Sequence, residues 1–111
     1  MTYEMNLNPR PFEAIKDGRK TVEMRLNDHR RKDIKVGDYI RFTHTENGDV
    51  LDVKVIGKNV YPSFNELYAV YDKTSIGYYE DEAASPLDML EYYTEEQIKE
   101  YGALAIEIEL I

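Results

Sequence analysis

Apolar and polar residues alternate over five short segments of the chain, as expected for half-buried β-strands. The clearest is the second, in which three apolar residues occupy one face and Thr21, Glu23 and Arg25 occupy the other. In the last segment, leucine and isoleucine side chains from Leu104 to Leu110 form one face and are expected to be buried. The predicted strands span residues 3–7, 21–26, 39–45, 50–57 and 104–110.

Two of these strands are expected to pair as a hairpin. Residues 39–45 and 50–57 flank the dipeptide Asn47-Gly48, which readily adopts the positive φ angles of a tight turn. Ile40 and Phe42 would then face the same side as Leu51, Val53 and Val55 of the partner strand, which gives the hairpin a consistent inward face.

Capping residues predict short helices between the strands. Asn8 precedes Pro9 at the start of the first helix, and Gly18 follows its last turn, where a glycine is favoured. The segment 72–84 has no periodicity and is predicted to be a long loop. Three further helices are expected to begin after Ser63, Ser85 and Thr94.

This order of elements predicts an α+β fold. Strands occur near both ends of the 111 residues, and short helices are inserted between them. The length suits one domain, residues 1–111, and no linker, repeat or low-complexity tract divides it. We therefore expect about five strands in a closed or nearly closed barrel.

Charge is distributed unevenly along the chain, whose net charge is −8. Residues 1–41 carry ten basic and seven acidic groups, a local charge of +3, whereas residues 42–111 carry four basic and fifteen acidic groups, a local charge of −11. This excludes a uniformly basic nucleic-acid binder, because each phosphate contact requires Lys or Arg. Double-stranded DNA is not an expected partner, and a small ligand or a short RNA is favoured over a duplex.

Other features of the sequence bear on the protein's location and on its ligand. The chain has no cysteine, no apolar run of about 18 residues and no signal-peptide pattern at its start, so we expect a cytoplasmic protein without a membrane span. Seven of the ten tyrosines lie between Tyr61 and Tyr93. Such tyrosines stack on a ligand ring or serve as ordinary core aromatics, and the sequence leaves both open.

The densest group of reactive side chains lies between Gly18 and Arg25. Glu23 and Arg25 project from one strand face, and Lys20 is expected in the preceding turn with its stem free to swing toward that face. Converging Lys, Glu and Arg side chains bind carbonyl, carboxylate or phosphate groups, or act as a base and an electrophile. The alternative is a solvent-exposed strand face with paired opposite charges.

Metal and phosphate-loop chemistry have weaker support in the sequence. Neither His29 nor His44 has a partner at metal-ligand spacing, and the adjacent acids 80–82 are typical of a solvated turn. No glycine-rich phosphate loop and no serine nucleophile motif occurs. We expect no metal and no cofactor.

The stretch Gly18-x-Lys20-x-x-Glu23-x-Arg25, placed after a short helix, resembles the signature of the ASCH domain family, whose members are PUA-like barrels. The context agrees, because residues 36–38 form a Gly-Asp turn into the next strand and a hydrophobic strand ends the chain. The resemblance covers residues 2–111. It implies a mixed β-barrel of five to six strands with short flanking helices and a cleft lined by the motif.

The family resemblance implies a partner that is RNA, a nucleoside or a nucleotide. We expect the protein itself to be a monomer or weak dimer. Lys20 and Arg25 would contact phosphate or carbonyl groups, Glu23 would accept from an exocyclic amine, and a tyrosine of residues 68–79 would stack on the base. The candidate ligand-binding residues are Gly18, Lys20, Thr21, Glu23, Arg25 and Tyr78.

An amidohydrolase is the alternative function. One small bacterial branch of the family hydrolyses the acetyl amide of N4-acetylcytidine with a Lys–Thr–Glu set. Lys20 matches that lysine, but Glu23 stands where the threonine would be, and Thr21 is a substitute on the same face. The third residue would come from the 72–84 loop, as Glu80 or Glu82. In this hypothesis Lys20 and Glu23 are catalytic and activate water.

Overall fold

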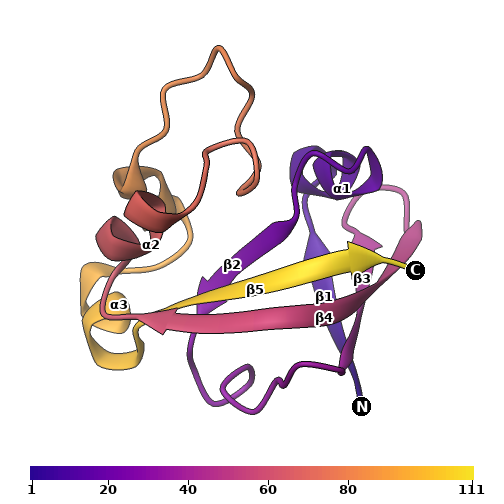
Figure 1. Cartoon of the computed structure of the whole chain (residues 1–111), viewed down its shortest axis with the longest axis horizontal. Helices are drawn as coiled ribbons and strands as arrows, with labels where there is room; N and C mark the ends of the chain where they lie inside the picture. Colours follow the sequence, from indigo (N-terminus) through magenta and orange to yellow (C-terminus); the bar gives the residue numbers. More distant parts are fainter.

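The computed structural model describes residues 1–111 as one five-stranded sheet with four short helical segments (Figure 1). The longest α-helix has eight residues, and no helix is long and apolar enough to cross a membrane. The elements are β1 (Thr2–Leu7), α1 (Pro9–Lys16), β2 (Val22–Leu26), β3 (Tyr39–His44), β4 (Val50–Tyr61), α2 (Phe64–Val70), the 3-10 helix η1 (Pro86–Glu91), α3 (Glu95–Tyr101) and β5 (Ala103–Leu110).

The sheet is mixed and has the strand order β1-β3-β4-β5-β2. Only β1 and β3 are parallel, and the other three neighbouring pairs are antiparallel. The sheet curls into a half-barrel whose two edges are β1 and β2 (Figure 1). The Arg25 guanidinium on β2 spans this seam, because its Nη2 donates to the Asn6 carbonyl of β1 at 2.9 Å.

Two apolar clusters pack on the sheet. The larger is covered by α1, which contributes Phe12 and Ile15, and the smaller lies under α2 and η1, which contribute Leu67 and Met89. Strand β5 belongs to both clusters, because Leu104, Ile106 and Ile108 enter the first while Ala103 and Ala105 enter the second. Small residues on that second face allow α2 to pack close to the strand.

The predicted α+β class and the five predicted strands are confirmed. The caps after Ser63, Ser85 and Thr94 are present, the last as a complete capping box, although the segment after Ser85 is a 3-10 helix. Strand β4 continues to Tyr61, beyond the predicted end at Gly57. A β-bulge between Val55 and Gly57 explains the difference, since a bulge shifts the faces and ends the simple alternation.

One core prediction is wrong. Leu110, expected inside with the other apolar residues of the last strand, is 41% exposed. Its partner across the sheet is Val53, beyond the bulge of β4.

Because β5 joins β2 to the rest of the sheet, its buried side chains should dominate the stability of the fold. We expect Ile106→Ala to lower the free energy of unfolding by roughly 2–5 kcal/mol, since Ile106 is fully buried and its truncation leaves a cavity. Leu110→Ala on the same strand is the matched control and should have a much smaller effect. Urea denaturation of both variants tests this, and equal effects would contradict it.

Candidate functional site

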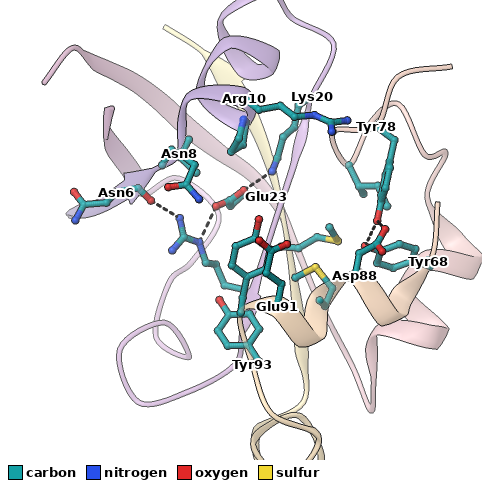
Figure 2. A pocket seen from close by; sticks show the side chains of 18 of the residues that line it. Asn6, Asn8, Arg10, Lys20, Glu23, Tyr68, Tyr78, Asp88, Glu91 and Tyr93 are labelled. Atoms are coloured by element: carbon teal, nitrogen blue, oxygen red, sulfur yellow. Dashed lines mark hydrogen bonds and ion pairs between the residues drawn. The ribbon is translucent and has the colours of Figure 1, made fainter. Parts of the chain in front are cut away.

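The end of α1 and the strand β2 bring three charged side chains together. Gly18 adopts a φ of 83° after the last turn, and the Lys20 amide donates to the Ala14 carbonyl at 3.0 Å, which folds the chain back over the helix end. Lys20 therefore precedes the strand, as predicted, and its Nζ lies 2.7 Å from Glu23 Oε1 (Figure 2). Arg25 Nε lies 2.7 Å from Glu23 Oε2. We call Lys20, Glu23 and Arg25 the charged triad.

The charged triad is buried, which sets it apart from an exposed strand face with paired charges. Lys20 and Glu23 are 7% and 3% exposed, and the Arg25 side chain is 14% exposed. Burial by itself raises the pKa of Glu23, but attraction and hydrogen bonds from the two cations outweigh it and hold that pKa below its usual range. Glu23 is therefore an ionised hydrogen-bond acceptor at neutral pH.

A pocket of about 430 Å³ opens above the charged triad. Its sides come from the start of α1, the loop before η1, η1 itself and the segment that follows it (Figure 2). The remaining lining residues are Asn6, Leu7, Asn8, Arg10, Pro11, Met24, Thr45, Tyr68, Ile76, Gly77, Tyr78, Glu82, Asp88, Met89, Glu91, Tyr92 and Tyr93.

A chain of hydroxyl groups forms the wall farthest from Asn6 and Asn8 (Figure 2). The hydroxyl of Tyr78 donates to Asp88 Oδ2 at 2.7 Å, and the hydroxyls of Tyr68 and Tyr78 lie 2.9 Å apart. Burial, together with these bonds to Tyr68 and Asp88, raises the pKa of Tyr78, so its phenol stays protonated. The wall is thus aromatic, with one carboxylate, that of Asp88, at its end.

The long loop between α2 and η1 is fixed over the pocket by contacts with α1 and β2. The Ser75 carbonyl accepts from the amides of Thr21 and Val22, at 2.9 and 3.0 Å. Glu82 forms an ion pair with Arg10. The Tyr79 ring makes cation–π contacts with the guanidinium groups of Arg10 and Arg19, which lie 4.9 and 4.4 Å from the ring centroid. The loop therefore forms an ordered side of the pocket.

The structure brings four of the predicted site residues into the pocket. These are Lys20, Glu23, Arg25 and Tyr78. Gly18 and Thr21 do not line it: Gly18 shapes the turn that places Lys20, and the exposed Thr21 precedes β2. Of the two loop acids, Glu82 lines the pocket and Glu80 does not.

Several lining residues were missed in the sequence. Asn8 is the N-cap residue of α1, as predicted, but its side chain makes no capping bond and instead accepts from Thr45 Oγ1 at 3.4 Å. Asp88 and Glu91 lie on η1, whose position over β2 depends on tertiary packing that no local pattern reveals. No group of three or more His, Asp or Glu side chains is arranged to hold a metal ion.

The model of the ASCH domain family matches residues 5–111. The chain belongs to the ASCH domain family. This confirms the resemblance drawn from the motif between Gly18 and Arg25, together with the PUA-like α+β fold that it implied. None of the curated proteins matches the sequence.

Solved structures resemble this ASCH domain over its whole length. Hypothetical protein PH0355 is 39% identical, with 100% of both chains covered and a TM-score of 0.85. Protein PF0455 from Pyrococcus furiosus is 36% identical, with 100% of this chain and 98% of its own covered, at a TM-score of 0.72. ASCH from Zymomonas mobilis is 19% identical over 97% of this chain and 66% of its own, at a TM-score of 0.70, and shares the fold.

Neutralising the central carboxylate should destabilise the protein in a pH-dependent way. We expect Glu23→Gln to lower the free energy of unfolding at pH 7 by roughly 3 kcal/mol, because it leaves two buried cations without their counter-charge. The pKa of Glu23 is lower in the folded than in the unfolded state, so its stabilisation is present above about pH 5. It is lost as the pH falls through the folded pKa.

Denaturation of wild type and Glu23→Gln between pH 7 and pH 3 measures this difference. The two should converge as the pH falls, whereas a gap that is constant with pH would contradict the assignment. Asp52→Asn is the control, because its ion pair with Arg41 is solvent-exposed and should contribute little at any pH.

Proposed function

We propose that this ASCH domain binds a nucleobase in the pocket, as a nucleoside or as one nucleotide of a short single-stranded RNA. The observation that carries the proposal is the buried charged triad at the base of a pocket with tyrosines in its walls. Buried ion pairs contribute little to stability on balance, because desolvation offsets their attraction. A buried triad that faces a cavity is therefore better explained by recognition of a ligand.

The charged triad offers both donors and an acceptor at one place. Lys20 has three N–H donors and Arg25 has five, of which Glu23 uses one from each and the Asn6 carbonyl uses one more of Arg25's. Each Glu23 carboxylate oxygen keeps a second lone pair. The hydrogen-bonding edge of a base presents carbonyl acceptors beside amine or imino donors, and this combination matches it.

The pocket walls suit a flat ring. Tyr68, Tyr78, Tyr92 and Tyr93 line the pocket together with Met24 and other apolar side chains. Aromatic side chains stack on bases regardless of sequence, which contributes roughly 1–3 kcal/mol per base. The volume of about 430 Å³ is within the range of small-ligand sites.

The charge of the pocket favours an uncharged ring as its occupant. Three basic side chains, Arg10 and the two of the triad, face four acidic ones, namely Glu23, Glu82, Asp88 and Glu91. A polyphosphate group would meet net negative charge there, whereas a neutral base would not.

Hydrolysis of an amide is less well supported than binding. Glu23 is held by both cations and its lowered pKa makes it a weak base. Thr45 provides the one aliphatic hydroxyl of the lining, and it donates to the Asn8 side chain rather than to a base. Glu82 is engaged by Arg10 and by the Tyr79 amide. The pocket therefore lacks an activated nucleophile.

Binding is tested by titrating the wild type with cytidine, uridine, adenosine and guanosine. Lys20→Met keeps the apolar stem but removes the charged donor, and should weaken binding of the preferred nucleoside about tenfold or more. Lys16→Ala, in the last turn of α1, is the matched control outside the pocket and should bind like the wild type. Isothermal calorimetry measures the affinities, and a wild type that binds none of the four would refute the proposal.

Catalysis is tested by incubating the protein with N4-acetylcytidine and following release of acetate. We expect no turnover by the wild type, because a carboxylate occupies the place of the hydroxyl nucleophile. Glu23→Thr restores the residue of the hydrolytic branch and tests whether the missing hydroxyl alone is limiting. Wild-type turnover that Lys20→Met abolishes would establish the amidohydrolase instead.

A further inference from the structure

A second cavity, of about 490 Å³, lies at the seam between β1 and β2. We call it the arginine groove. It shares Asn6 and Arg25 with the pocket, so the two cavities adjoin at the place where Arg25 crosses the seam. Its other lining residues are Tyr3, Glu4, Met5, Arg30, Arg31 and Thr43.

The arginine groove has the opposite charge balance to the pocket. Among the lining residues, Arg25, Arg30 and Arg31 face one acid, Glu4, whereas acids outnumber bases in the pocket. Glu23 and Asp28, which pair with Arg25 and Arg31, do not line the groove, and Arg30 has no such partner. All of these residues belong to the N-terminal third of the chain, which carries the positive charge of an otherwise acidic protein. The groove is where part of that charge gathers on one surface.

The arginines are held in different ways. Arg31 is 14% exposed at its side chain and donates to Asp28 Oδ2 at 2.8 Å, which fixes its guanidinium at the edge of the groove. The exposed Arg30 makes no ion pair and no side-chain hydrogen bond with the protein. The ion pair with Asp28 gives Arg31 a role in the folding of the loop, but nothing in the fold of the protein requires the charge of Arg30.

Arg25 connects the two cavities chemically. Its Nε donates to Glu23 and its Nη2 donates to the Asn6 carbonyl, so two of its five N–H groups are used. The other three have no protein acceptor and are available to a ligand at the seam. A planar guanidinium with free donors suits two oxygens of a phosphate better than a single carbonyl.

We propose that the arginine groove is a phosphate subsite for a ligand whose base occupies the pocket. Arg25 bonds the phosphate at the seam, Arg31 provides a fixed guanidinium and Arg30 provides an exposed, unpaired one. The preferred ligand is then a nucleoside monophosphate or a nucleotide linked within single-stranded RNA, rather than a free nucleoside. This inference rests on the proposed function, because it requires a base in the pocket.

This division resolves a difficulty that net charge poses for binding any nucleotide. A protein of charge −8 repels a phosphate on most of its surface. The pocket accepts the neutral base, and the adjoining groove accepts the anionic group. Each part of the ligand therefore meets the cavity whose charge suits it.

The test compares each nucleoside with its 5′-monophosphate, its 3′-monophosphate and the corresponding dinucleotide. For the wild type, a phosphate at one of the two positions should raise affinity about tenfold, and binding should weaken with salt. In the double variant Arg30→Ala, Arg31→Ala the ratio of nucleotide to nucleoside affinity should fall to about one. The double variant Lys32→Ala, Lys35→Ala removes the same charge from the same loop, outside the groove, and should keep the wild-type ratio.

If the loss of Arg31 in the double variant disturbs the loop, the single variant Arg30→Glu tests the groove without that change. Because Arg30 is exposed and unpaired, this variant should melt like the wild type and still lower the ratio. The inference is overturned if the phosphate adds no affinity to the wild type, or if the ratio survives in the arginine variants while nucleosides still bind. If no nucleoside binds, the proposed function fails, and the inference, which requires a base in the pocket, fails with it.

Whether the phosphate is terminal or internal follows from the same titrations. A monophosphate that binds as tightly as the dinucleotide identifies a mononucleotide ligand. A dinucleotide that binds more tightly than either monophosphate identifies an RNA strand that continues along the groove.

Discussion

The buried carboxylate of Glu23 is the interaction on which the rest of the site depends. It is 3% exposed and lies between Lys20 Nζ and Arg25 Nε, each 2.7 Å from one of its oxygens. Without that negative charge, two cations would have to be buried next to one another, which is far more costly than burying all three groups together. Glu23 thereby allows the cationic donors Lys20 and Arg25 to line a partly closed cavity, where a hydrogen bond to a ligand is stronger than in water.

The half-barrel explains why two cavities meet at one residue. A sheet that curls without closing leaves β1 and β2 as edges, and unpaired edges need a cover or a partner. Arg25 bridges this seam to the Asn6 carbonyl, and it lines both the tyrosine-lined pocket and the arginine groove. The same side chain thus completes the fold and separates a cavity for a ring from a cavity for an anion.

The sequence predicted what short-range physics determines. The alternation along β2 predicted that Glu23 and Arg25 share one face and that Lys20 lies in the turn before the strand. Capping residues predicted where most helices begin. It could not predict the pocket walls, because the loop before η1 has no period and is ordered by distant partners such as Arg10 on Glu82. The groove was not foreseen either, because its lining residues come from β1, β2, β3 and the loop after β2, and only the tertiary fold brings these together.

The central claim, that the charged triad serves a ligand rather than the fold alone, is most directly tested by NMR of the four methionine methyl groups. Met24 and Met89 line the pocket, Met5 lines the arginine groove, and Met1 is exposed and lines neither. Titration with the preferred nucleoside should shift the Met24 and Met89 signals saturably, while the Met1 signal stays in place. Saturable binding that leaves Met24 and Met89 unmoved would place the ligand elsewhere and contradict the account.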